Sequence, residues 1–190
     1  MKEKLRALLA QRDIQHITST SRVPAAVLVP IYEKQGQYHI LFIKRTETVK
    51  EHKGQISFPG GNREKGDRTL LDTALREGTE EIGLLAQDVE VLGELDDEVT
   101  TTSNYIVSPF LAVIPWPYRF KMNKGEVAEI IEVPVLALMD KKCVHRDTEL
   151  VDGKEVNSYT YHYQGRIIWG ATARILNKLL DIFTRAMADG

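Results

Sequence analysis

Residues 60–84 read GGNREKGDRTLLDTALREGTEEIGL, and this stretch decides how the rest of the chain is interpreted. Its periodicity predicts a helix over 69–82, because Thr69 and Asp72 have the spacing of a capping box and Gly83 is a typical stop signal. Upstream, the residues FPGG (58–61) predict the end of a short strand, followed by glycines that let the backbone approach a ligand or metal closely.

The predicted helix carries Glu77, Glu80 and Glu81 at positions i, i+3 and i+4, which places three carboxylates on one face. Like charges at this spacing each cost a few tenths of a kcal/mol, and Gly78 in a helix interior costs roughly 1 kcal/mol more. A divalent cation such as Mg²⁺ or Mn²⁺ removes the conflict, while the alternative is a solvated acidic face. Arg76 lies one turn before Glu80 and is expected to hold that carboxylate, leaving the other two free.

Together these residues resemble the Nudix box, Gly-x5-Glu-x7-Arg-Glu-U-x-Glu-Glu-x-Gly-U, where U is a bulky apolar residue. The chain departs from this pattern at three places. Counting from Gly61, Asp67 stands where the box has Glu, Arg76 follows after eight residues rather than seven, and Gly78 replaces the first apolar residue. These departures resemble the branch of the family that cleaves coenzyme A.

The preceding segment is also similar to that branch, whose motif reads Leu-Leu-Thr-x-Arg-Ser/Ala-x3-Arg-x3-Gly-x3-Phe-Pro-Gly-Gly. Arg45, Gly54 and the FPGG residues agree with it. Ile43 and Thr46 do not, and Lys50 stands where Arg is expected, which keeps the charge but loses the bidentate geometry. The segment IWGATARIL (168–176) resembles the same branch.

The resemblance implies an α/β fold, a Nudix-type α/β/α sandwich with a mixed sheet, spanning residues 1–190 as one domain. It further implies that the box carboxylates and the backbone carbonyl of Gly61 bind the cation. The implied catalytic residues are Arg76, Glu77, Glu80 and Glu81, and the implied metal ligands are Glu77, Glu80, Glu81 and Gly61. The general base varies across the family, so Glu126, outside the box, is a further catalytic candidate from this sequence alone. The implied substrate-binding residues are Arg45, Lys50, Gly60 and Gly61.

For three groups of residues, an alternative interpretation remains open. Glu126, with Glu129 close behind, is a candidate general base, and the alternative is a solvated strand edge. Arg45 and Lys50 are expected to contact substrate phosphates because they precede the glycine loop, although each alone reads as surface charge. Trp169 could stack on a base, but a buried aromatic residue at a strand end is favoured.

The remaining sequence predicts strands mixed with helices. Helices are expected over 2–12, 135–139 and 171–187, strands over 24–30, 38–44, 56–58, 89–95 and 105–114, and a loop leading into a strand over 125–133. Hairpin turns are expected at Asp152-Gly153 and Gln164-Gly165.

Composition excludes several classes of protein. The 190 residues carry a formal net charge of −2, which implies no bulk attraction to nucleic acid or membrane. The single cysteine, Cys143, excludes an internal disulfide, and the charged N-terminus lacks the apolar core of a signal peptide, so a cytoplasmic location is expected. No phosphate-binding Gly-rich loop, nucleophile elbow or zinc-like His spacing occurs. The oligomeric state stays open, a homodimer included.

The expected function is metal-dependent hydrolysis of a small pyrophosphate substrate, coenzyme A or its thioesters, to 3′,5′-ADP and 4′-phosphopantetheine or its acylated form. One alternative is a Nudix enzyme acting on ADP-ribose or a dinucleotide. A different class is a Nudix-fold binding module without turnover, which the intact Arg-Glu-x-x-Glu-Glu at 76–81 argues against.

Overall fold

The computed structural model describes residues 1–18, 21–47, 53–101, 103–151 and 153–188. Its α-helices are α1 (Lys2–Ala10), α2 (Leu70–Ile82), α3 (Val135–Met139) and α4 (Gly170–Ala188). The larger sheet contains β1 (Val23–Lys34), β2 (Gln37–Arg45), β3 (Ile56–Ser57), β4 (Gly60–Asn62), β5 (Glu90–Glu94), β6 (Glu98–Val99), β7 (Tyr105–Val113) and β8 (Val127–Pro134). The smaller sheet contains β9 (Val144–Val151), β10 (Lys154–Tyr163) and β11 (Arg166–Ile168).

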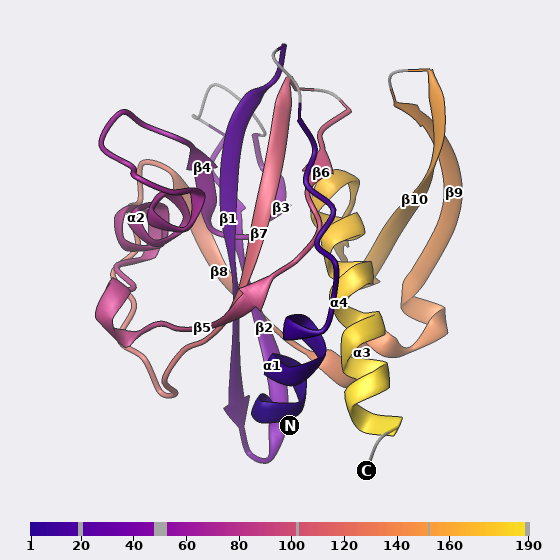
Figure 1. Cartoon of the computed structure of the whole chain (residues 1–190). Coiled ribbons are helices and arrows are strands. Elements are labelled where there is room, and N and C mark those ends of the chain that lie inside the picture. Colours follow the sequence, from indigo (N-terminus) through magenta and orange to yellow (C-terminus); the bar gives the residue numbers. More distant parts are fainter. Residues whose placement is uncertain (19–20, 48–52, 102, 152, 189–190) are drawn as a thin grey trace.

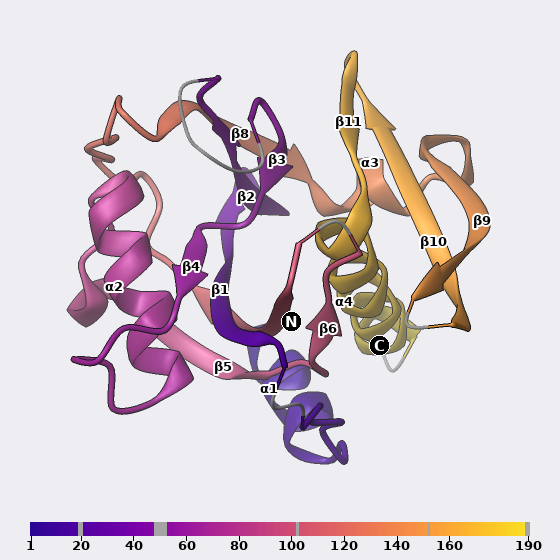
Figure 2. The same cartoon turned by 90° about the horizontal axis from the view of Figure 1, so that it is seen from above.

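The larger sheet is mixed and lies between two layers of helices. Its strands run in the order β3-β2-β1-β7-β5, with β4 paired to β1, β6 to β7 and β8 to β2. Strands β1 and β7 are parallel, whereas the other pairs are antiparallel. Helix α2 covers one face, and α1 and α4 cover the other (Figures 1 and 2). The predicted α/β/α sandwich with a mixed sheet is therefore confirmed.

Strand β1 lies in the middle of the larger sheet, and both of its faces are buried. Val29 and Ile31 pack in the core cluster that includes α1 and α4, while Ala26 and Leu28 pack in the cluster that includes α2. All four side chains are fully buried. Alternate residues of a strand point to opposite faces, so a strand covered on both sides reads as a continuous apolar run, as β1 does before its last two residues, Glu33 and Lys34.

The smaller sheet packs on α4, on the side away from the larger sheet (Figure 2). The predicted turn at Gln164-Gly165 joins β10 to β11, and both residues have positive φ, 48° and 76°. Strands β9 and β10 form the other predicted hairpin, although Asp152 itself lies outside the described residues. Among the described residues no helix is long and apolar enough to cross a membrane.

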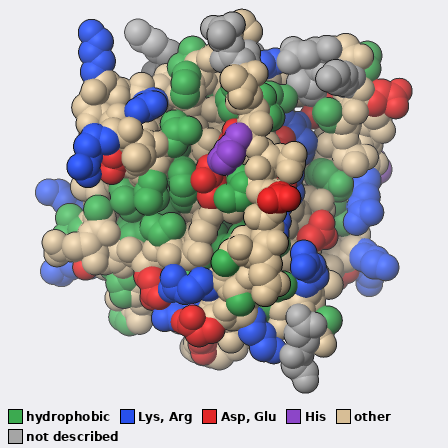
Figure 3. All heavy atoms as spheres, in the orientation of Figure 1, with side chains coloured by type: hydrophobic (Ala, Val, Ile, Leu, Met, Phe, Trp, Pro, Cys, Tyr) green, Lys and Arg blue, Asp and Glu red, His purple; other side chains and the backbone are tan. Residues whose placement is uncertain are grey.

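Basic and acidic side chains are interspersed on the face that Figure 3 shows, rather than separated into areas of one sign. This distribution agrees with the small net charge of the chain.

The glycines predicted to let the backbone approach a ligand or metal lie in strand β4, Gly60–Asn62. It pairs antiparallel with β1, with Gly61 opposite Ala26. A Cβ atom at Gly60 would lie 2.3 Å from the carbonyl oxygen of Ala26, so only glycine permits this approach. The pairing fixes the glycines directly beside α2, the helix that carries the acidic residues.

Helix α2 begins and ends as its sequence predicts. The Thr69 hydroxyl accepts a hydrogen bond from the Asp72 backbone N–H at 3.1 Å, and the Asp72 carboxylate accepts one from the Thr69 N–H at 2.9 Å. Gly83 follows the helix in the left-handed conformation, with φ at 69°. The capping box and the glycine stop therefore set both ends of the helix.

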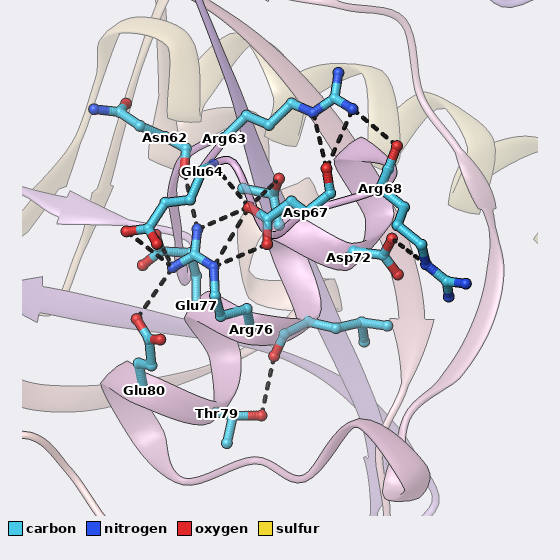
Figure 4. Close-up of polar contacts among 12 residues, drawn as sticks. Asn62, Arg63, Glu64, Asp67, Arg68, Asp72, Arg76, Glu77, Thr79 and Glu80 are labelled. Carbon is cyan, nitrogen blue, oxygen red and sulfur yellow. Dashed lines mark hydrogen bonds and ion pairs between the residues drawn. The ribbon is translucent and has the colours of Figure 1, made fainter.

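Asp67 fixes the loop between β4 and α2 (Figure 4). It is 8% exposed and accepts hydrogen bonds from Arg76 Nε at 3.1 Å, from the Thr73 hydroxyl at 2.9 Å and from the Glu64 N–H at 2.9 Å. Arg76 also donates to the backbone carbonyl of Asn62 at 2.9 Å. The hydrogen bond from Arg76 is the main cause that lowers the pKa of Asp67 to about 2.

Alanine substitutions at Gly78, inside α2, and at Gly83, directly after it, are expected to have opposite effects on stability. A Cβ at Gly78 would lie 3.6 Å from Leu28, an ordinary contact, so Gly78→Ala should stabilise the fold by up to about 1 kcal/mol and raise Tm by about 2–4 °C. Gly83→Ala should lower Tm, because φ is positive and the Cβ would lie 2.8 Å from that of Lys121. Thermal unfolding of both variants tests this; a stabilised Gly83→Ala protein contradicts it.

Asp67→Asn should show a pH-dependent loss of stability. Because the folded pKa of Asp67 lies below its unfolded value of about 4, its stabilising contribution is full above that unfolded pKa and is lost as pH falls through about 2. The Tm difference from the unmodified protein should therefore be large at pH 7 and shrink as pH approaches 2. Glu64→Gln is the control, since that carboxylate is exposed and 3.9 Å from Arg76. A Tm difference independent of pH would refute the assignment.

Candidate active site

A cavity of about 560 Å³ lies beside the β1–β4 pair. The cavity is lined by residues from most parts of the chain, and five of the residues that the sequence predicted are among them. These are Arg45, Gly60, Gly61, Glu77 and Glu126. The fold therefore brings together residues that are up to 81 positions apart in sequence (126 − 45).

Glu81 is buried behind the glycine loop and has two partners. One of its carboxylate oxygens accepts a hydrogen bond from Arg45 Nη1 at 2.9 Å, and the other accepts one from the Gly60 backbone N–H at 2.9 Å. The side chain is only 1% exposed. Burial raises the pKa of Glu81 to about 8, against the opposing effects of Arg45 and the Gly60 N–H.

Glu77 lies against the second glycine, since a Cβ at Gly61 would come 2.4 Å from its Oε1. Arg76 Nη1 donates to Glu77 Oε1 at 2.9 Å and to Glu80 Oε2 at 3.1 Å (Figure 4). The expectation that Arg76 leaves Glu77 free is therefore wrong, because one guanidinium nitrogen serves both carboxylates. Burial raises the pKa of Glu77, although Arg76 opposes the shift.

These contacts fit a divalent cation. Glu77 and Glu81 sit on the face of α2 that meets the glycines, and burial makes the charged form of both unfavourable. Glu80 is more exposed, at 56% of its side chain, and offers a third carboxylate from the same helix. An all-oxygen set of donors suits Mg²⁺ or Mn²⁺ better than softer metals.

The Arg45 guanidinium lies close to the carboxylates of Glu81 and Glu126. Besides its ion pair with Glu81, its Nη2 is 4.0 Å from Glu126 Oε2, and its buried Nε has no hydrogen-bond partner among the described residues. The predicted partner of Arg45 in phosphate binding, Lys50, lies outside the described residues. The prediction for Lys50 therefore stays a prediction.

The structure separates the two candidates for the general base. Glu126 lines the cavity, is 45% exposed and accepts a hydrogen bond from Asn123 Nδ2 at 3.0 Å. Glu129 instead forms an ion pair with Arg166 and does not line the cavity. Of the pair, only Glu126 is placed to reach a substrate there.

Trp169 is the clearest departure from the sequence analysis. The favoured expectation of a buried aromatic residue is wrong, because Trp169 is 40% exposed and lines the cavity. Thr100, Thr101 and Tyr105 line it as well and were not identified from the sequence. No local pattern signals them, because β7 and the first turn of α4 meet only in the folded chain.

A further group of polar side chains lies outside this cavity. His16 Nδ1 is 3.9 Å from Glu94 Oε1 and 3.6 Å from Asp97 Oδ2. Their ligand atoms lie within 4.8 Å of one another, and none of the three residues lines the cavity. Because His16 is far from Glu94 and Asp97 in the sequence, no spacing typical of a metal site predicts this cluster.

Comparison with known proteins places these observations in a family. Residues 22–152 match the NUDIX domain family. The chain is 36% identical over 155 residues to the uncharacterized Nudix hydrolase NudL of Photorhabdus laumondii, covering 82% of each chain. It is 34% identical over 164 residues to the protein of the same name from Yersinia pestis, covering 86% of this chain and 81% of that protein.

Solved structures share the fold at low sequence identity. A MutT/nudix family protein from Enterococcus faecalis superposes with a TM-score of 0.59 at 14% identity, covering 98% of this chain and 69% of that one. The NUDIX domain of Shewanella oneidensis NrtR, whose structure contains ADP ribose, gives a TM-score of 0.50 at 16% identity, covering 68% and 82%. Given the matched domain and these relatives, the chain belongs to the Nudix hydrolase family, enzymes of the pyrophosphate-cleaving kind.

Proposed function

We propose that this enzyme hydrolyses the pyrophosphate bond of coenzyme A or of its acyl thioesters. The reaction type is supported by one observation: Glu77, Glu126 and Arg45 line one cavity beside Gly60 and Gly61, and the buried Glu81 binds both Arg45 and the Gly60 N–H. Water adds to one phosphorus atom, the bridging P–O bond breaks, and the products are 3′,5′-ADP and 4′-phosphopantetheine or its acylated form.

The residues proposed to hold Mg²⁺ or Mn²⁺ are Glu77, Glu80, Glu81 and the backbone carbonyl of Gly61. When bound, such a cation neutralises phosphate charge and lowers the pKa of a coordinated water. Arg76 and Arg45 prepare the site, because each guanidinium fixes the position of a box carboxylate before substrate arrives.

Glu126 is the proposed general base. It faces the cavity, and its hydrogen bond from Asn123 fixes one carboxylate oxygen while the other lies toward Arg45. A carboxylate held in this way can accept the proton of an attacking water within hydrogen-bond reach. Arg45 is then a positioning residue for both Glu81 and Glu126.

The choice of coenzyme A rests on the residues that match the branch motif. Arg45, Gly54 and the FPGG residues support it, as do the eight-residue spacing before Arg76 and the segment 168–176. The proposal is further supported because Arg45, Phe58, Gly60, Gly61 and Trp169 line one cavity. The competing substrate is ADP-ribose, which the distant NrtR domain binds, but 16% identity supports a shared fold alone.

Glu81→Gln should lower kcat by about 100-fold or more while the fold survives, because the amide cannot supply the charge that a cation needs. It should also lose metal-dependent stabilisation. Mn²⁺ at about 100 times its Kd stabilises a protein by about 2.7 kcal/mol, or roughly 5–10 °C in Tm for a chain of this size. Glu129→Gln is the matched control and should keep both properties. Full turnover by Glu81→Gln at low Mg²⁺ would refute the proposal that Glu81 binds the metal.

The substrate itself is tested by a panel of pyrophosphates with Mg²⁺ and Mn²⁺, with products identified by mass. The kcat/KM for coenzyme A should exceed that for ADP-ribose or NADH by about tenfold or more, which corresponds to only about 1.4 kcal/mol of extra transition-state binding. If ADP-ribose or NADH is the better substrate, the proposal of coenzyme A fails while the metal site stands.

A further inference from the structure

The cavity has a second side beyond the carboxylates. Helix α2, which carries the glutamates, and the first turn of α4 lie on opposite sides of β1 and β4 (Figure 2). The α4 side is lined by Trp169, Ala171 and Ile175, together with Tyr105 and Val107 of β7. We refer to these five residues as the α4 wall.

Trp169 is the exposed member of the α4 wall, whereas the side chains of Val107 and Ile175 are buried. Trp169 exposes 40% of its surface, although Ile168, its neighbour in β11, is buried. Ala171 and the adjacent Gly170 have little or no side chain, so the space in front of Trp169 remains open. A large aromatic side chain facing a cavity is a typical contact for an apolar part of a ligand.

The charges of the cavity decide which part of a substrate fits this wall. Among the described residues that line the cavity, Arg45 is the single basic one, and its guanidinium is already paired with Glu81. Glu64, Glu77 and Glu126 add negative charge. Among the described residues that line the cavity, no unpaired cationic group is therefore left for a phosphate held against the α4 wall, which makes its burial there unfavourable.

The two halves of coenzyme A differ in this respect. The nucleotide half carries an additional 3′-phosphate, whereas the pantetheine arm is uncharged beyond its own phosphate and ends in a thiol or thioester. We propose that the α4 wall binds the pantetheine arm and its acyl chain, with Trp169 as the main contact. The inference rests on the proposed function and names the substrate half that this side of the cavity selects.

Trp169→Ala should therefore act selectively on substrates that carry the arm. We expect kcat/KM for hexanoyl-coenzyme A to fall at least tenfold and that for ADP-ribose, which lacks the arm, to change less than twofold. Each buried methylene accounts for about fourfold, the equivalent of about 0.8 kcal/mol. Ile167→Ala is the matched control, because Ile167 is 50% exposed in strand β11, two residues before Trp169, and does not line the cavity.

A second variant tests the inference by adding a large side chain to the α4 wall instead of removing one. Ala171→Phe should fill the space in front of the wall and reduce kcat/KM for hexanoyl-coenzyme A more than for free coenzyme A, by a further tenfold. Wild-type failure to hydrolyse either compound refutes the proposed function. Hydrolysis by the wild type, with equal losses on hexanoyl-coenzyme A and ADP-ribose in Trp169→Ala, refutes the inference alone.

Fluorescence gives a readout that does not depend on turnover. The chain has two tryptophans, and Trp116 lies elsewhere, stacked on Tyr32, so Trp116→Phe leaves Trp169 as the sole reporter. With Mg²⁺ present, 4′-phosphopantetheine should shift the emission of Trp169 to shorter wavelength and 3′,5′-ADP should not. Quenching by 3′,5′-ADP without a response to 4′-phosphopantetheine would assign the wall to the nucleotide half, and no response to either would also overturn the proposal.

Discussion

The carboxylates of Glu77 and Glu81 are held against the backbone of Gly60 and Gly61, and much of the structure is arranged around this contact. Burial makes both charges unfavourable, and the protein compensates only in part, with Arg45 on one side and Arg76 on the other. A Cβ at Gly60 would collide with the backbone carbonyl of Ala26, and a Cβ at Gly61 would displace the carboxylate of Glu77. The carboxylates of the proposed metal site are thus positioned by the β1–β4 pairing.

Two guanidinium groups do different work at this contact. Arg76 joins helix α2 to its preceding loop, because it binds Asp67, the Asn62 carbonyl and the carboxylates of Glu77 and Glu80 at once. Arg45 comes from the central sheet and binds the most buried carboxylate, Glu81. The helix is therefore fixed both to its own loop and to the sheet. Such rigidity matters in a hydrolase, because small misplacements of the reacting groups reduce the rate strongly.

The sequence predicts well the features that depend on neighbours along the chain. The caps of α2, the apolar run of β1 and the glycine approach all follow from local patterns, and the family resemblance supplied the three-layer fold. Contacts between residues far apart in the chain could not be predicted from the sequence. The pairing of Arg45 with Glu81, the sharing of Arg76 by two glutamates, and the exposure of Trp169 depend on how distant elements meet. Asp67 looked like a departure from a pattern, whereas it is the partner that fixes Arg76.

The central claim is that buried carboxylates are kept in conflict so that a cation can relieve it. Calorimetric titration of the protein with Mn²⁺ at pH 7.5, in two buffers with different ionisation enthalpies, tests this most directly, because it counts the protons released on binding. With the pKa of Glu81 raised to about 8, the account predicts that Mn²⁺ binding releases protons, and that less is released as pH rises above 8. Binding without proton release at pH 7.5, or the absence of binding, would contradict the account.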